Sequence, residues 1–236
     1  MEVGQNINTK VGSWNFGNSV PDNFVEHAKL SIPMYSQGHE LILDLSEFFV
    51  KEESITYEIG VSTGELIRKL SSRNEHKKYC KFIGIDIEKA MVKKAQKLCK
   101  DYSNISIEHS DVNNFEFEKN DLTIAYYCIQ FIPPRIRQEI FNKIYNSLNW
   151  GGAFILFEKV RASDARFQDM ISQIYQEYKI DQGYSSEEII AKSRSLKGVL
   201  EPFTSKANNQ YLTRAGFKDV YSVMKFLCFE GWVAIK

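Results

Sequence analysis

The 236-residue chain is poor in the residue types that build metal centres and disulfide frameworks. It has four cysteines and four histidines, and every histidine precedes residue 110. No CxxC or Cys/His ligand spacing occurs among the cysteines, which are Cys80, Cys99, Cys128 and Cys228. We therefore expect neither a metal site nor disulfide pairing, and the thiols are typical of a cytoplasmic protein.

An excess of charge and a long apolar run are also absent. Thirty Lys and Arg residues balance thirty Asp and Glu residues, which argues against a generally basic nucleic-acid binder. A lysine stripe on the helix expected at 88–100 fits a solvated face better than a nucleic-acid contact. No apolar run approaches the roughly 20 residues of a membrane span, and residues 1–10 lack the layout of a secretion signal. We expect a cytoplasmic protein that works without a membrane.

The chain does contain a regular alternation of short apolar runs and helical patterns. Five apolar runs are typical of strands, at 55–59, 81–86, 105–108, 122–127 and 153–157. Five helical patterns precede or separate them, at 22–30, 37–50, 64–70, 88–100 and 133–148. This alternation predicts an α/β fold with a parallel sheet covered on both faces.

The end of the chain departs from this alternation. Residues 162–200 have a purely helical pattern, and two strand-like runs follow at 220–224 and 226–235. These two runs are too close together for a crossover helix, so they must be antiparallel neighbours. We expect one structural domain in three parts: an N-terminal arm and helical lid at 1–50, the sheet at 51–160 with 201–236, and a helical lid insertion at 161–200.

A candidate ligand site lies where the first expected strand ends, in the segment 58–64. Gly60 permits a sharp turn off the strand, and Gly64 lets the next helix begin close to the sheet, so backbone N–H groups can face a ligand. Acidic residues end three successive strands, namely Glu58, Asp86 and Asp111. The position of Asp86 suits the two hydroxyls of a ribose, and that of Asp111 suits an adenine amino group. The pattern favours a nucleoside ligand without a pyrophosphate.

The same segment also has the G-x-S-x-G spacing of a serine hydrolase. The order Ser62, Asp86, His109 matches a catalytic triad on paper. The expected position of the turn, after the first parallel strand, and the lack of a later histidine argue against that interpretation.

Taken together, these features resemble the class I S-adenosylmethionine (SAM)-dependent methyltransferases and, within them, the carboxy-SAM synthases. Segments carrying the resemblance are 14–16, 32–36, 58–64, 85–86, 130–131, 143–145, 158–159, 183–185 and 215–217. The resemblance implies a Rossmann-like seven-stranded methyltransferase sheet, a homodimer, SAM as cofactor with S-adenosylhomocysteine as product, and no metal. By position it implies that the nucleoside is bound by Tyr35, Gly60, Val61, Ser62, Asp86, Ile87, Asp111 and Val112.

The chain departs from the resembled family at two positions of the site. Tyr126 stands where the family has an asparagine, and Ser193 stands where it has an arginine that holds the extra carboxylate of carboxy-SAM. Arg194 is one residue later, which on a helix is a rotation of about 100°. Because a buried carboxylate without its cation is costly, we expect plain SAM rather than carboxy-SAM as the ligand.

Candidates for the reacting half of the site follow from these positions. Tyr126 and Tyr127 are both candidates to face the methyl group or simply to pack. Alternation along the strand would send them to opposite sides, so only one can face it, and Tyr127 is a candidate to contact the substrate. His27 is a candidate base, with His39 as a second choice. Glu158 could bind an acceptor amine or cap a helix, and Arg194 could bind an anionic acceptor.

Three functions remain open from the sequence. The first is a methyltransferase acting on a small-molecule acceptor. The second, implied by the resemblance, is carboxy-SAM synthesis with prephenate as the carboxyl donor, in the pathway that modifies the tRNA wobble uridine. The third is a non-catalytic SAM-binding protein, which the substitutions at Ser62, Tyr126 and Trp150 keep open.

Overall fold

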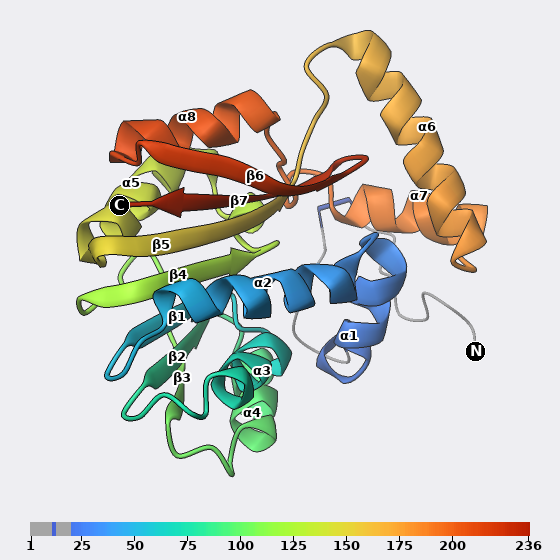
Figure 1. Cartoon of the computed structure of the whole chain (residues 1–236). Coiled ribbons are helices and arrows are strands. Elements are labelled where there is room, and N and C mark those ends of the chain that lie inside the picture. Colours follow the sequence, from blue (N-terminus) through green and yellow to red (C-terminus); the bar gives the residue numbers. More distant parts are fainter. Residues whose placement is uncertain (1–10, 13–19) are drawn as a thin grey trace.

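A computed structural model describes residues 11–12 and 20–236, and most of the expected N-terminal arm lies outside them. Seven strands form one sheet in the order β3-β2-β1-β4-β5-β7-β6 (Figure 1). Their bounds are β1 Ile55–Ile59, β2 Lys81–Asp86, β3 Ile105–His109, β4 Asn120–Tyr126, β5 Leu148–Lys159, β6 Asp219–Phe226 and β7 Phe229–Ile235. All seven expected strands are present, and β5 is longer than the expected run because it begins at Leu148.

The first five strands are parallel, and the last two form the expected antiparallel hairpin. β4 pairs with β1 and with β5 in parallel register, whereas β7 runs antiparallel to both β5 and β6. The chain reverses between β6 and β7 at Leu227, which has a φ of 51°. A turn this short cannot hold a crossover helix, which is why the pairing is antiparallel.

Helices cover both faces of this sheet. The helices are α1 Val20–Ser31, α2 Tyr35–Phe49, α3 Glu65–Arg73, α4 Lys89–Leu98, α5 Pro134–Ser147, α6 Ala165–Asp181, α7 Ser186–Ser195 and α8 Ser205–Ala215, with a 3-10 turn η1 at Ile129–Phe131. Side chains alternate along β5: Ile155 and Phe157 belong to the apolar core shared with α2 and α3, while Phe154 and Leu156 belong to the core shared with α5 and α8. No helix within 20–236 has both the length and the apolar character needed to cross a membrane.

The lid insertion, expected to be helical, contains two helices, α6 and α7. The α6 helix ends at Asp181, Gly183 has a φ of 94°, and Ser185 then caps α7. The Ser185 hydroxyl accepts from the backbone of Glu188, and the Glu188 carboxylate accepts from the backbone of Ser185, which is a capping box. The α6 and α7 helices extend beyond the sheet at the end where α1 lies (Figure 1).

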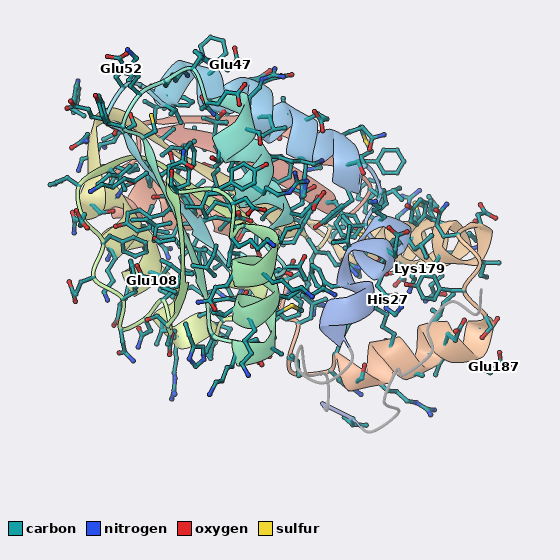
Figure 2. The ribbon with its side chains drawn as sticks, turned by 90° about the horizontal axis from the view of Figure 1, so that it is seen from below. His27, Glu47, Glu52, Glu108, Lys179 and Glu187 are labelled. Carbon is teal, nitrogen blue, oxygen red and sulfur yellow. The ribbon has the colours of Figure 1, made fainter. Side chains whose placement is uncertain are left out.

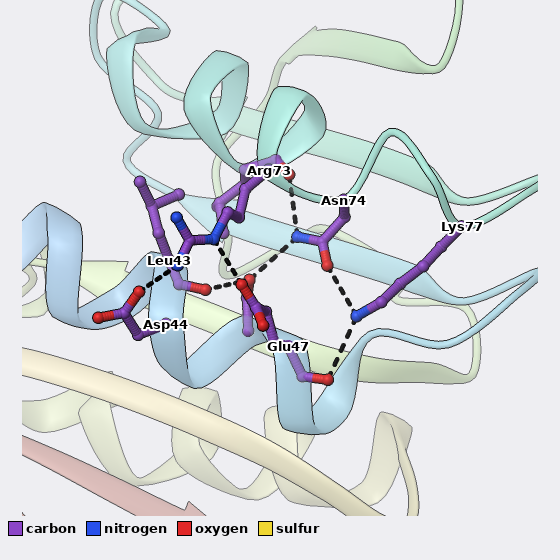
Figure 3. A network of polar contacts seen from close by, with 8 residues as sticks. Leu43, Asp44, Glu47, Arg73, Asn74 and Lys77 are labelled. Atoms are coloured by element: carbon purple, nitrogen blue, oxygen red, sulfur yellow. Dashed lines mark hydrogen bonds and ion pairs between the residues drawn. The ribbon is translucent and has the colours of Figure 1, made fainter.

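A polar network joins α2 to α3 on one face of the sheet (Figure 3). The buried side chain of Asn74 donates to the Ser46 hydroxyl at 3.0 Å and to the Leu70 carbonyl at 3.0 Å. Nearer the surface, Arg73 forms ion pairs with Asp44 and Glu47. These contacts hold α2 in place, and α2 carries the Tyr35 end of the site described next.

Candidate functional site

The sheet order reverses direction between β1 and β4, and a cavity opens at the carboxyl ends of these strands. In open α/β sheets this crevice is the preferred place for a ligand. The cavity has a volume of about 1070 Å³, which exceeds the usual range for one drug-sized ligand and leaves room for two small molecules. Its lining comes from the strand ends and from the helices α1 to α7.

The turn after β1 requires a glycine at position 60. Gly60 has a φ of 72°, and a Cβ placed there would collide with the Cys128 thiol. The N–H groups of Gly60 and Val61 both donate to the Ile85 carbonyl, at 2.8 and 3.0 Å. Gly64 has a φ of 84° and lies against Ala95, so it supports the turn from behind and does not itself line the cavity.

Asp86 is held rigidly at the edge of this turn. Its two carboxylate oxygens accept from the backbone N–H groups of Ser62, at 2.8 Å, and Glu88, at 2.9 Å. Burial raises the pKa of Asp86 above its ordinary value, although the backbone donors oppose that rise. A carboxylate offers about four acceptor positions, so the Asp86 carboxylate retains acceptor capacity for a ribose hydroxyl.

Glu58 presents a buried carboxyl oxygen to the cavity. One oxygen accepts from the backbone of Ile67 in the first turn of α3, whereas Oε2 has no hydrogen-bond partner among the described residues. Burial and the nearby charge of Asp86 raise the pKa of Glu58 well above its usual range. A neutral carboxyl can donate a hydrogen bond as well as accept one, so this orphaned atom fits a polar group of a bound nucleoside.

The remaining predicted nucleoside contacts also line the cavity. Asp111 accepts from the backbone N–H of Asn113 at 2.9 Å, which orients its carboxylate beside the buried Val112. Tyr35 is buried at the start of α2, and the exposed Ile87 follows Asp86. The structure thus brings together the predicted residues from four separate elements, and their binding roles stay predictions.

The serine hydrolase interpretation has no geometric support. The Ser62 hydroxyl points to the Met91 sulfur at 3.6 Å, and the His109 ring contacts the Ile87 carbonyl at 2.9 Å. Ser62 has a φ of 52°, and its backbone N–H donates a hydrogen bond to the Asp86 carboxylate. The G-x-S-x-G spacing belongs here to the turn between β1 and α3, and the geometry of a nucleophile elbow with its triad is not present at these residues.

Tyr126 and Tyr127 correct a prediction from strand alternation. Both line the cavity, and their ring centroids are 4.6 Å apart. Alternation fails because β4 ends at Tyr126 and Tyr127 has a φ of 55°, which turns its side chain to the same side. The Tyr126 hydroxyl donates to the Tyr35 carbonyl at 2.6 Å, and burial raises the pKa of Tyr126 well above its usual range. Its hydroxyl therefore orients α2 and is a poor base.

The two candidate histidine bases both line the cavity. Burial, with a smaller effect from the charge of Lys192, lowers the pKa of His27. Burial lowers the pKa of His39 to about 3, and His39 packs between the rings of Tyr35 and Tyr126. Both imidazoles are neutral at pH 7, so both retain a nitrogen that can accept a hydrogen bond.

Two predicted substrate residues lie away from the cavity lining. Glu158 is buried behind it and accepts from the backbone of Ile129 and Gln130 in η1, which is the capping alternative considered for it. Arg194 is exposed on α7, whereas Ser193, one residue earlier, lines the cavity. The two neighbouring side chains of α7 therefore point in different directions, as expected for successive residues of a helix, and Arg194 does not take the place of an arginine at position 193.

Three lysines that sequence reasoning missed line the same cavity. Lys159 ends β5, Lys179 lies on α6 and Lys192 on α7. Nothing in their spacing could have found them, because the three elements are separate in sequence and only packing brings their side chains together. Within the described chain, no group of three His, Cys, Asp or Glu side chains is placed to hold a metal ion.

Comparison with known proteins places this geometry in a family. Residues 57–152 match a family model described as a methyltransferase domain. A carboxy-S-adenosyl-L-methionine synthase of Staphylococcus epidermidis is 37% identical over 224 residues, covering 94% of this chain and 97% of that protein. The synthase of Campylobacter lari is 36% identical over 222 residues, covering 94% of each. The chain belongs to the carboxy-S-adenosyl-L-methionine synthase family. It is a SAM-dependent enzyme of the methyltransferase type.

Solved structures agree on the fold of this synthase family member. An O-methyltransferase family protein of Burkholderia thailandensis superposes with a TM-score of 0.67 at 12% identity, covering 92% of this chain and 59% of that one. Human N-acetylserotonin methyltransferase in complex with SAM gives 0.61 at 17% identity, covering 92% and 55%. The chain spans a little over half the length of either protein. The sheet is the methyltransferase sheet, and the orphaned Glu58 oxygen and the glycine turn fit SAM.

Proposed function

We propose that this protein is a carboxy-SAM synthase, which transfers a carboxylate to the S-methyl carbon of SAM. The observation that carries the proposal is the extent of the similarity to the synthases. The methyltransferase-domain match ends at residue 152, whereas the similarity to the synthases covers 94% of the chain. It therefore extends over the α1 and lid elements that build the second half of the cavity, and these elements decide the second substrate.

The reaction balances with the donor that the resemblance implies. The S-methyl carbon loses one hydrogen as a proton and forms a carbon–carbon bond to the carboxyl group. Prephenate supplies that group as carbon dioxide and becomes phenylpyruvate as its hydroxyl leaves as hydroxide. The proton and the hydroxide combine to water, so no oxidant or reductant is needed.

The residues of this chain supply positioning for that reaction. Asp86 and Glu58 hold the nucleoside side, and Tyr126 and Tyr127 present aromatic rings at the end of β4. The faces of such rings stabilise a nearby cation such as a sulfonium. Neutral His27 and His39 both line this cavity, and we propose His27 as the group that takes a proton, because it is half-buried and keeps contact with solvent.

Methyl transfer to a small anionic acceptor is the second candidate. Ser193 favours it, because this uncharged side chain lines the cavity where the resemblance implies an arginine for the extra carboxylate. Methyl transfer is the leading expectation from the sequence, and we rank it second because the similarity to the synthases covers 94% of the chain. A homodimer and a cytoplasmic location remain proposals from the resemblance and the composition.

Mass spectrometry of small molecules tests the choice. Freshly purified protein is extracted, and a second sample is incubated with SAM and prephenate. Carboxy-SAM in the extract, or its formation together with phenylpyruvate, is the expected result. SAM or S-adenosylhomocysteine in the extract, with no carboxy-SAM formed on incubation, would reject the synthase reaction and justify a screen of methyl acceptors. Binding of SAM with no product from either reaction would leave the non-catalytic alternative.

A further inference from the structure

Three lysine side chains gather in the half of the cavity that the nucleoside residues do not line. Lys159, Lys179 and Lys192 come from β5, α6 and α7, and all three line the cavity. Figure 2 shows Lys179 and His27 at the same end of the molecule, where α1 meets the lid helices, and Glu47 and Glu52 at the other end. Lys179 therefore lies at the lid end of the molecule, as His27 does.

Tyr175 is the aromatic centre of the cluster. The Lys159 ammonium lies 4.3 Å from the centroid of its ring, and the Lys179 ammonium lies 4.7 Å from the same centroid. The Tyr175 hydroxyl donates to the Ser31 carbonyl at 2.8 Å, which fixes the ring against α1. One anchored ring thus holds two like charges close together, with the ring face offsetting part of their repulsion.

Lys192 joins the cluster from the other side of Ser31. Its ammonium donates to the Ser31 hydroxyl at 2.6 Å and lies 5.3 Å from the centroid of Tyr184. The hydroxyls of Ser31 and Tyr184 are themselves 2.9 Å apart. Since Tyr175 and Tyr184 both bond to Ser31, a single residue of α1 sets the positions of all three lysines.

Two lysines of this cluster have no acidic partner among the described residues. No carboxylate among the described residues forms an ion pair with Lys159 or Lys179. Burial, followed by the charges of the neighbouring lysines, lowers the pKa of Lys179 to about 8 and the pKa of Lys192 to about 7. Holding such cations together costs free energy, and an anion bound among them recovers it.

We propose that Lys159, Lys179 and Lys192 form the subsite that binds the carboxylate groups of the second substrate. The inference rests on the proposed function for the identity of that substrate, but the cluster itself predicts only a multiply charged anion. Ammonium donors bind a carboxylate as strong, charge-assisted hydrogen bonds without a fixed geometry. In this proposal, the positive charge that faces the extra carboxylate of carboxy-SAM comes from Lys192 rather than from residue 193.

The test separates anion binding from nucleoside binding. S-adenosylhomocysteine has no reactive methyl group, so protein loaded with it binds a second ligand without turnover. Isothermal titration calorimetry measures the Kd of S-adenosylhomocysteine for each protein, and then the Kd of prephenate and of citrate, used as a plain anionic probe, for the loaded protein. The variants are Lys179→Met and Lys192→Met, the charge-preserving Lys192→Arg, and the control Lys206→Met, which removes an exposed lysine of α8.

Lys179→Met and Lys192→Met, the two cavity variants, should each weaken prephenate and citrate binding at least tenfold, equivalent to about 1.4 kcal/mol. Lys192→Arg should lose much less, Lys206→Met should match wild type, and the Kd of S-adenosylhomocysteine should change less than about twofold throughout. An equal loss of S-adenosylhomocysteine affinity would overturn the proposal, because the lysines would then bind the carboxylate of the nucleoside. Unchanged anion binding in both variants would also overturn it. If a methionine variant has a lowered Tm, Lys179→Gln or Lys192→Gln replaces it at the same position.

The proposed function can fail separately. Wild-type protein that makes no carboxy-SAM but binds citrate through the lysines would reject the synthase reaction and keep the subsite. If the wild-type protein makes carboxy-SAM and the KM for prephenate is unchanged in Lys179→Met and Lys192→Met, the synthase reaction stands and the subsite is rejected.

Discussion

Glu158 carries a carboxyl group whose charge depends strongly on burial. The side chain is enclosed on β5 and accepts backbone hydrogen bonds from η1. Burial raises the pKa of Glu158 from 4.5 to about 8, although the charge of Arg137 opposes the rise. Between these two pH values the folded protein holds a proton that the unfolded chain releases. The contribution of Glu158 to stability is therefore complete below about pH 4.5 and is lost as the pH rises through 8.

Glu158→Gln should remove this pH dependence, because the amide stays neutral. As the pH rises from 5 to 8.5, the wild-type protein should lose stability that the variant keeps, so the Tm of the variant should rise relative to that of wild type. The free energy of unfolding of wild type changes through Glu158 by at most about 1.4 kcal/mol per pH unit. Differential scanning calorimetry measures it, and Glu187→Gln on the exposed side of α7 is the control. A difference independent of pH would mean that Glu158 is ionised throughout.

At the scale of elements, the junction between α2 and α3 combines buried and exposed polar contacts (Figure 3). Asn74 is 1% exposed, and its side chain bonds to Ser46 and Leu70 and accepts from Lys77 at 2.9 Å. Arg73 makes its two ion pairs in solvent, with 41% of its side chain exposed. Buried hydrogen bonds are costly to leave unmade, while exposed ion pairs contribute little.

Asn74→Ala should therefore destabilise the protein more than Arg73→Ala does. We expect the free energy of unfolding to fall by about 1–3 kcal/mol in Asn74→Ala, because the buried partners lose their hydrogen bonds. Urea denaturation of both variants beside wild type measures the difference. Equal losses would show that the exposed pairs, and not the buried amide, hold the two helices together.

At the scale of the whole molecule, Arg137 connects the cavity floor to the lid. Its guanidinium donates to the carbonyls of Ile132, at 2.7 Å, and Gln130, at 2.9 Å, beside η1, and to that of Glu201, at 2.9 Å, where the chain returns from the lid. The two ends of the lid also meet each other, since the Arg161 N–H donates to the Phe203 carbonyl at 2.9 Å. The lid is thus fastened at its base by backbone contacts.

Arg137→Lys should loosen that base, because an ammonium group cannot reach three carbonyls as the planar guanidinium does. Amide hydrogen exchange should become faster at 129–132 and 199–204 and stay unchanged in β1 and β2. Mass spectrometry of exchanged peptides measures it, with the exposed Arg214→Lys as control. Faster exchange throughout the sheet would instead indicate a global loss of stability, and unchanged exchange at 199–204 would show that the backbone contacts suffice.

The predicted fold was largely right because most elements carry a local signal. The β1 run at 55–59 is apolar and β-branched, and the structure has the strand at the same residues. The α8 helix was missed because its sequence is mostly polar and buries only Asn208 and Leu212, which leaves little apolar periodicity to detect. The predicted helical pattern at 162–200 carried no internal boundary, and the structure divides it into α6 and α7 around Gly183, which has a left-handed conformation.

The sequence by itself determined the strand and helix alternation, the glycine turn at Gly60 and the family, because these depend on residues that are close together in the chain. Tertiary structure decided what faces the ligand. The left-handed backbone of Tyr127 brought two tyrosines to one side, and packing of α6 and α7 over β5 brought Lys159, Lys179 and Lys192 into one cavity. Side chains from distant segments meet only when the elements pack, and no local pattern encodes such a meeting.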